Sequence, residues 1–334
     1  MNSSVIVSKQ ANDGFASLDT NLTPNLKGLD EVISFLQAKL DKKTNTNSDI
    51  SGITGISDYQ AALQCLVSIR ENIKNNTVDK GFKTGVSSID DLIGGFYKGT
   101  LNVLASRSGV GKTALACQIA YNNARDETHK RPIFFFSPDM SERQLNARYC
   151  ASVAKANIEE LGNLSNFQLN EIVNDMKNVG NKVTFFYGHF DLSIEEIRSE
   201  LNSFIKDKGL APGLIIIDSF LEMMLKKDEP IAPQYAYAAY EKIALELKAI
   251  AREYDLAVLV LTQVGRSQDG PNSLPHPENL RGGNGLYQVS DLTFFLHQQK
   301  YNNEERVVYV AKNHLGSLGQ TTVHYDGPHY TFYD

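Results

Sequence analysis

One short stretch of this sequence constrains the fold more than any other part of it. The apolar run 101–105 leads into a loop of small and polar residues, and the amphipathic segment 114–120 follows that loop. The loop consists of Ser106, Arg107, Ser108, Gly109, Val110, Gly111, Lys112 and Thr113. A strand, a glycine-containing turn ending in Gly-Lys-Thr and then a helix make up the phosphate loop of nucleotide-binding proteins. In this arrangement, backbone N–H groups and the positive end of the helix bind phosphate oxygens.

Two side chains of the loop have expected roles in nucleotide binding. Lys112 is expected to reach the β- and γ-phosphates of ATP, and the Thr113 hydroxyl is expected to hold Mg²⁺. The match to the general pattern is incomplete, because that pattern has glycine five positions before Gly111 and this chain has Ser106 there. The order of strand, loop and helix still favours a phosphate site over a chance match in a glycine-rich loop.

Composition narrows the class of protein. The length of 334 residues indicates one large or two modest domains. The hydrophobic content of 42% is enough for a buried core. No apolar run approaches the roughly 20 residues that span a bilayer, and the polar segment 1–27 lacks a signal pattern. The scattered cysteines Cys65, Cys117 and Cys150 predict reduced thiols in a cytoplasmic protein without a membrane partner. The net charge of −6 gives no overall basic surface, so any contact with nucleic acid must be local.

The sequence divides into three regions. Residues 1–27 are rich in Asn, Ser and Thr and are predicted to be a disordered tail. Residues 28–80 are predicted to be a helical N-terminal extension and linker, with amphipathic helices at 29–40 and 59–73. These helices are too few for an independent core, so they either pack on a neighbouring domain or subunit or form a loosely ordered tail. Residues 81–334 are predicted to form the main domain.

From residue 81 onward, strand-like apolar runs alternate with helical segments, which predicts an α/β fold. The expected strands are 101–105, 133–137, 183–187, 214–217, 257–262, 292–296 and 306–311, and the expected helices are 113–123, 142–154, 194–206 and 235–254. Such alternation implies a largely parallel sheet with helices on both faces. Ser141 with Gln144 and Ser193 with Glu196 fit capping boxes at two helix starts. A β-hairpin formed by the segments 307–311 and 321–325, with a long loop at 312–319, is expected near the end of the chain.

Acidic residues follow two of the expected strands. Asp218 ends the aliphatic run 214–217, and a buried parallel strand delivers such a side chain to the sheet edge where ligands bind. Next to a phosphate loop this carboxylate is expected to join the Mg²⁺ site, although polar residues are common at strand ends. Asp139 follows the run 133–137 and is a candidate to polarise the attacking water. Its spacing fits nearly as well an acid that is stabilised by the dipole of the next helix.

An amide and a long loop follow another strand. Gln263 ends the run 257–262 and is a candidate sensor of the γ-phosphate, or else a partner for the backbone at the strand end. The loop 264–286 is long for a compact domain, which usually indicates function. Its Arg266 and Arg281 are candidates to bind the phosphates of a DNA strand, and a plain solvated loop is the alternative.

With these elements in this order, residues 81–334 resemble the motor domain of the DnaB family of replicative hexameric helicases. The segment 106–113 resembles the family's loop Ala-Arg-Pro-Ser-Met-Gly-Lys-Thr, in which the departure at Ser106 is expected. The other matching segments are 82–92, 94–101, 136–140 (family Phe-Ser-Leu-Glu-Met), 214–219, 261–267 (family Leu-Ser-Gln-Leu-Asn-Arg-Ser), 280–291 and 312–314 (family Lys-Gln-Arg). Together they extend over about three quarters of the chain.

The resemblance implies a RecA-like P-loop NTPase fold and an ATP-dependent, ring-forming DNA helicase or translocase that acts on single-stranded DNA in replication. It implies ATP and Mg²⁺ as ligands, a homohexameric ring, and a replicative helicase, loader or primase as a further partner. Asp139 takes the position of the family's catalytic glutamate. Lys312 and His314 take the positions that complete the site of the adjacent subunit.

Three departures from the family pattern support an alternative. Asp139 is one methylene shorter than the family's glutamate, and small misplacements of a catalytic group are costly. His314 replaces the family's arginine finger, and Lys312 alone keeps that positive charge. Residues 1–80 offer only a tail and two helices where the family has a globular domain. The alternative is a helicase-like ATP-binding assembly or regulatory protein with weak hydrolysis that loads, caps or inhibits a true helicase. A strand-exchange or clock-type ATPase on this fold is disfavoured by the 312–314 hairpin.

Overall fold

The computed structural model gives the fold of most of the chain. The residues that it describes are 26–44, 56–74, 80–138, 140–180, 182–187, 192–224, 236–265, 273–299 and 304–334. They belong to two compact units, a smaller one within Ser17–Lys80 and a larger one that contains Gly81–Asp334. The predicted tail lies outside the described residues except for its last two positions. The division into three regions therefore stays a prediction.

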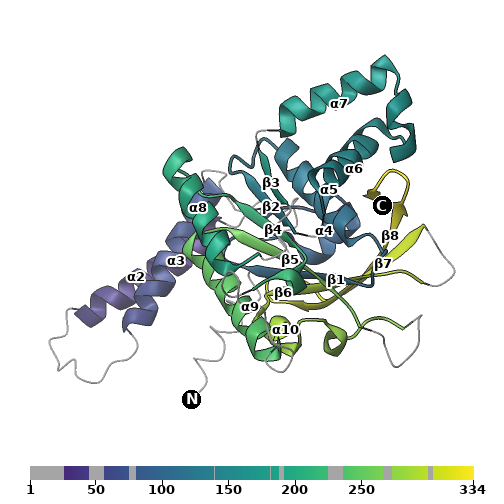
Figure 1. Ribbon diagram of the computed structural model, residues 1–334. Helices are drawn as coiled ribbons and strands as arrows, with labels where there is room; N and C mark the ends of the chain where they lie inside the picture. Colours follow the sequence, from purple (N-terminus) through teal and green to yellow (C-terminus); the bar gives the residue numbers. More distant parts are fainter. Residues whose placement is uncertain are drawn as a thin grey trace. The chain divides into compact units, whose positions relative to one another are not determined.

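A nine-stranded sheet organises the described part of the larger unit, with the strand order β3-β2-β4-β5-β1-β6-β7-β8-β9 (Figure 1). The parallel strands are β1 (Leu101–Ser106), β2 (Ile133–Ser137), β3 (Val183–Tyr187), β4 (Leu214–Asp218), β5 (Ala257–Gln263) and β6 (Leu292–His297). The antiparallel strands are β7 (Glu305–Asn313), β8 (Gly319–Asp326) and β9 (Thr331–Tyr333). β1 and β4 are buried along their whole length, and β5 along all but its last residue, as their continuous apolar runs require.

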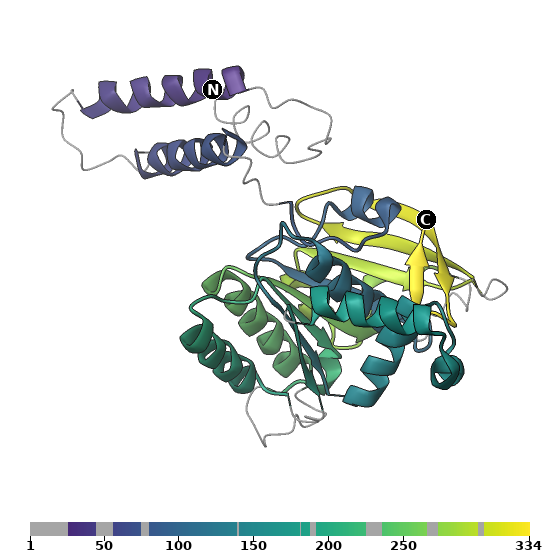
Figure 2. The same cartoon turned by 90° about the horizontal axis from the view of Figure 1, so that it is seen from above.

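Helices cover both faces of this sheet (Figures 1 and 2). One face carries α4 (Ser87–Ile93), α5 (Lys112–Arg125), α6 (Glu142–Ala154), the 3₁₀ turn η1 (Ile158–Asn163) and α7 (Asn166–Val179). The other face carries α8 (Ile194–Lys208), η2 (Phe220–Glu222), α9 (Ala236–Glu253) and α10 (Asn284–Val289). The 3₁₀ turn η4 (Pro277–Asn279) precedes α10. The larger unit is therefore a three-layer α/β/α structure.

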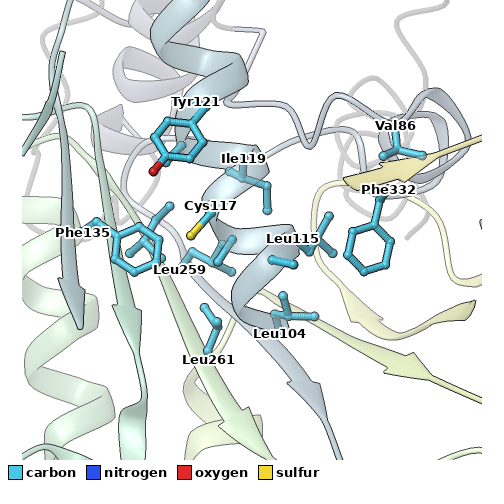
Figure 3. Packing of buried hydrophobic residues seen from close by; sticks show 14 of the residues in the cluster. Val86, Leu104, Leu115, Cys117, Ile119, Tyr121, Phe135, Leu259, Leu261 and Phe332 are labelled. Atoms are coloured by element: carbon cyan, nitrogen blue, oxygen red, sulfur yellow. The ribbon is translucent and has the colours of Figure 1, made fainter. Parts of the chain in front are cut away.

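Alternate residues of each strand supply two separate cores, because successive side chains of a strand point to opposite faces. Leu104 of β1 and Leu259 of β5 belong to the core under α5, where Leu115 packs (Figure 3). Val103 and Val260 belong to the core under α8 and α9. The fully buried strands thus contribute apolar side chains to both layers at once.

The described part of the smaller unit consists of α2 (Leu26–Thr44) and α3 (Ile56–Lys74), which lie side by side (Figure 2). Arg70 Nη1 donates a hydrogen bond to Asp30 Oδ1 at 3.2 Å. Asp30 lies near the start of α2 and Arg70 near the end of α3, so the helices are antiparallel. The helices expected at 29–40 and 59–73 are thus present, are longer than expected and contact each other.

The predicted α/β fold, with a largely parallel sheet and helices on both faces, is confirmed, as are both predicted capping boxes. Strands β1, β4 and β5 extend beyond their expected ends to include Ser106, Asp218 and Gln263, and β6 and β7 extend to His297 and Asn313, so the expected loop at 312–319 is shorter. Elements that the sequence reading missed are α4, α7, α10 and β9. Among the described residues, no helix is both long and apolar enough to cross a membrane.

Replacement of Leu115 by alanine tests the packing of α5 on the sheet. Leu115 is completely buried, so Leu115→Ala should lower the free energy of unfolding by about 2–5 kcal/mol. Leu245→Ala is the matched control, because Leu245 lies on α9 with 52% of its surface exposed and should cost less than about 0.5 kcal/mol. Urea unfolding measures both, and equal losses would contradict this assignment of the core.

Candidate functional site

The ends of three parallel strands meet at one edge of the sheet, which we call the carboxyl edge. β5 lies between β4 and β1 and pairs in parallel with both. The register places Ser106 beside Gln263 and Asp218 beside Leu261. The phosphate loop after β1, the carboxylate that ends β4 and the amide that ends β5 are consequently neighbours along this edge.

The phosphate loop turns at glycines and ends at the start of α5. Gly109 and Gly111 have φ values of +79° and +115°, which side chains with a Cβ rarely adopt. A Cβ on Gly111 would also lie 2.9 Å from the ring of Phe332, so the position requires glycine for space as well. α5 then begins at Lys112, and the positive end of the helix faces the loop.

The remaining loop residues divide into a buried and an accessible set. Ser106, the departure from the general pattern, is fully buried, and its hydroxyl donates to the carbonyl oxygen of Arg107 at 2.7 Å. Val110 is also buried, whereas Ser108 and Gly109 are exposed. A serine at position 106 is accommodated because its hydroxyl forms a local hydrogen bond inside the turn.

Thr113 and Asp218 come together at the first turn of α5. Thr113 Oγ1 donates a hydrogen bond to Asp218 Oδ2 at 2.5 Å, and Asp218 is only 8% exposed. Hydroxyl and carboxylate oxygens are the ligands that Mg²⁺ prefers, and in nucleotide sites it commonly takes one or two of them together with water and phosphate. The pair therefore fits the Mg²⁺ role predicted for it. Within the described residues, no group of three or more Asp, Glu, His or Cys side chains forms a metal site.

Two opposing effects act on the pKa of Lys112. Burial lowers the pKa of its ammonium group below the ordinary value, and the Asp218 carboxylate raises it. A cation that is partly removed from water gains from a nearby anion, because the anion replaces the lost hydration. A phosphate anion beside Lys112 would favour the charged form of the side chain in the same way as Asp218 does.

Gln263 contacts the loop in which the DNA-binding candidates lie. Its Oε1 accepts a hydrogen bond from Arg281 Nη1 at 3.2 Å, and its backbone oxygen accepts from Arg281 N at 2.8 Å. The hydroxyl of Thr262 donates to the backbone oxygen of Arg281 at 2.7 Å. Val264 pairs with Leu280, so the described parts of the loop return to the end of β5. The contact joins the candidate γ-phosphate sensor directly to a candidate DNA contact.

Lys312 and His314 lie at the opposite edge of the sheet, which we call the amino edge. β7 is antiparallel to β6, and Lys312 pairs with Thr293 near the start of β6. The Lys312 ammonium donates to the backbone oxygens of Tyr287 and Gln288 at 2.9 and 2.8 Å, at the end of α10. Burial lowers the pKa of Lys312, the Asp291 carboxylate opposes that effect and Lys248 adds to it. The structure does not bring Lys312 or His314 to the phosphate loop of the same chain.

Asp291 organises the charged groups at the amino edge. Its carboxylate forms an ion pair with Lys248 and accepts a hydrogen bond from Leu101 N at 2.8 Å. His314 Nδ1 lies 3.5 Å from the other carboxylate oxygen, and His314 N donates to Asp291 O. The His314 side chain is nonetheless 56% exposed, so its ring faces solvent.

Asp139 and Arg266 lie outside the described residues, so the roles expected of them stay predictions. The described chain reaches Ser137 at the end of β2, beside β4 on the carboxyl edge. It also reaches Gly265, whose backbone N–H donates to Asn279 O.

The sequence reading missed a cavity of about 750 Å³ along α5. Its other walls include residues of α6 and α7, the turn between β8 and β9, and β9 itself. Two of its lining residues are Arg148 and Tyr330, and the guanidinium carbon of Arg148 lies 5.1 Å from the centre of the Tyr330 ring. The only signal for it in the sequence is the aromatic character of residues 325–333, because its walls come from distant segments.

The fold and the carboxyl edge together define a RecA-like P-loop NTPase. The family described as DnaB-like helicase C terminal domain matches residues 81–334, and the chain belongs to that family. This finding confirms the resemblance that the sequence motifs indicated.

Relatives and solved structures agree with the family. A probable replicative DNA helicase of Trieres chinensis is 27% identical over 96% of this chain and 71% of its own length. The replicative DNA helicase DnaB of Treponema pallidum is 30% identical over 75% of this chain, which spans 56% of that relative. A similar fold occurs in a solved ATPase domain, with a TM-score of 0.70 and 18% identity, over 85% of this chain and 99% of that one. A second solved structure, of a DnaB-like replicative helicase and its interactions with primase, has a TM-score of 0.67 and 17% identity, over 91% of this chain and 76% of that one. These findings support a replicative helicase and do not favour the regulatory alternative.

Asp218→Asn tests the electrostatic contact between Lys112 and Asp218. Removing the carboxylate removes the influence that raises the pKa of Lys112, so this pKa should fall further below its ordinary value. An NMR titration of the labelled lysine measures the change. Asp255→Asn, at the amino edge, is the control and should leave the Lys112 pKa as it is. An unchanged or raised value in Asp218→Asn would contradict the contact.

Proposed function

We propose that this chain is the ATP-hydrolysing motor of a ring-forming replicative DNA helicase that moves along single-stranded DNA. The observation that carries the proposal is the arrangement at the carboxyl edge, where the phosphate loop, Asp218 and Gln263 adjoin and Gln263 holds Arg281. The candidate phosphate site and a candidate DNA contact share this edge. Changes at the nucleotide therefore have a short route to the DNA.

The residues of the carboxyl edge divide the work of hydrolysis. The loop N–H groups and Lys112 bind the phosphates and offset their negative charge. Thr113 and Asp218 would hold Mg²⁺, which neutralises phosphate charge when it is bound. Asp139 is the candidate that orients the attacking water, with a reach shorter by one methylene than that of the glutamate in the family. Gln263 is placed in this scheme as the sensor of the γ-phosphate.

The cavity along α5 is the proposed site of the nucleotide base. It lies along α5, the helix that follows the phosphate loop, and its lining includes the planar side-chain groups of Tyr330 and Arg148. An aromatic ring and a planar guanidinium suit stacking against a purine.

The amino edge is proposed to serve the adjacent subunit. Lys312 and His314 are at the wrong edge for the phosphate loop of their own chain, and they match the segment that completes a neighbouring site in the family. A homohexameric ring would put these side chains opposite the nucleotide of the next subunit. His314 supplies positive charge there only when it is protonated.

The proposed partners follow from the same scheme. Arg266 and Arg281 would contact the phosphates of single-stranded DNA inside the ring. A loader or a primase is proposed as a protein partner, since one solved structure with this fold concerns a DnaB-like replicative helicase and its interactions with primase. The cytoplasm is the proposed location.

Lys112→Ala tests the central proposal. The variant should lose at least about 100-fold in DNA-stimulated ATP hydrolysis and should not unwind a forked duplex, because the phosphates lose their main cation. Lys206→Ala, which removes an exposed lysine of α8 that is assigned to neither site, should keep both activities. Phosphate release and strand separation are the measurements. Wild-type hydrolysis no greater than that of Lys112→Ala would refute the proposal.

Mixing two inactive variants tests the role of the amino edge. The Lys112→Ala subunit lacks its phosphate-loop cation, and a Lys312→Ala/His314→Ala subunit lacks the groups offered to a neighbour. Each should be inactive alone, yet a mixed ring contains interfaces with a complete set, so hydrolysis should return in part. Absence of any regain, with mixed rings verified by mass spectrometry, would place these side chains outside the neighbour's site.

A further inference from the structure

Arg306 is a buried arginine of β7 whose side chain reaches the phosphate loop. It lies near the start of β7, which runs antiparallel to β6, so it sits at the carboxyl edge. Only 4% of its surface is exposed. Burial disfavours the charged guanidinium and lowers the pKa of Arg306. A buried charge of this kind requires compensating partners.

The loop itself supplies one of these partners. Arg306 Nε donates a hydrogen bond to the backbone oxygen of Val110 at 2.9 Å, and Nη1 donates to Glu305 O at 2.9 Å. The guanidinium carbon lies 4.9 Å from the centre of the Tyr325 ring. Tyr325 in turn stacks on Phe332, with centroids 4.5 Å apart, and Phe332 lies against Gly111. Arg306, Tyr325 and Phe332 therefore form a continuous support behind Val110 and Gly111, which we call the loop support.

The bond to Val110 fixes the orientation of one peptide unit. In a trans peptide the C=O and the next N–H point in opposite directions, so holding the Val110 oxygen toward Arg306 aims the Gly111 N–H the other way. Gly111 has no Cβ and tolerates either sign of φ, so the glycine itself does little to prevent this peptide from flipping. A flipped peptide would present a carbonyl oxygen where a phosphate loop needs an N–H donor.

We propose that Arg306 is a positioning residue for nucleotide binding, which keeps the Val110–Gly111 peptide in the phosphate-binding orientation through its hydrogen bond to the Val110 oxygen. The inference rests on the proposed function of the loop, but it concerns this chain's own support for that loop. Arg306 does not touch the nucleotide. Its effect is on the readiness of the loop, so its loss should weaken binding more than it slows the chemical step.

Arg306→Met removes the donor and the charge while it keeps much of the side-chain volume. The Kd for a non-hydrolysable ATP analogue and the KM for ATP should both rise about tenfold or more, as loss of a hydrogen bond to a charged donor implies. The kcat at saturating ATP should stay within about threefold of wild type, because the catalytic groups are untouched. Arg306→Lys keeps a cationic donor and should recover most of the affinity. If the methionine variant does not fold, Arg306→Gln takes its place.

Arg131→Met is the matched control. Arg131 also donates to backbone oxygens, those of Ala211, Pro212, Tyr254 and Asp255, but it lies at the amino edge. The Arg131→Met variant should have a lower melting temperature than wild type but an unchanged Kd for the analogue and an unchanged KM for ATP. Equal increases in both variants, or an unchanged Kd in Arg306→Met, would overturn the proposal. A wild-type protein that binds the analogue without hydrolysing ATP would instead contradict the proposed function and leave the binding test of Arg306 intact.

Discussion

The parallel pairing of β4, β5 and β1, in that spatial order, is the constraint on which the rest of the site depends. It puts the ends of three strands in register at one edge, so that groups more than 100 residues apart in the sequence touch there. The hydrogen bond between Thr113 and Asp218 is the most direct result. Because these strands are buried on both faces, a one-residue shift of register would move their side chains into the opposite core and disturb the packing of both layers.

Much of this arrangement could be predicted from the sequence, because it depends on local patterns. The apolar run before Ser106 and the Gly-Lys-Thr after it define a strand, a turn and a helix, and aliphatic runs that end in Asp218 and Gln263 define the neighbouring strand ends. Periodicity is weaker where elements are short. α10 and β9 have six and three residues, too few to establish a period, and neither was anticipated. α7 carried a usable signal, since Ser165 and Gln168 form a capping box like those that were recognised.

The parts of the site that the sequence did not reveal depend on contacts between distant segments. Nothing local to residue 306 indicates that an arginine at the start of an antiparallel strand reaches the carbonyl of Val110, 196 positions earlier. The cavity along α5 likewise takes its walls from segments that are far apart in the sequence, including α6, α7 and β9. Even the requirement for glycine at position 111, which the motif suggests, depends in part on the space taken by Phe332 of the last strand.

α10 connects the two edges of the sheet in a way that bears on how a ring of such subunits would work. The helix begins three residues after Arg281, which contacts Gln263, and the carbonyls at its other end hold the ammonium of Lys312. Six helical residues rise only roughly 9 Å, too short a length to bend appreciably. The contact proposed to sense a subunit's own nucleotide and the cation proposed to serve its neighbour thus lie at the two ends of one short segment, in which Gly282 and Gly283 join Arg281 to α10. The order of nucleotide events in adjacent subunits would then depend on how this segment moves within each chain.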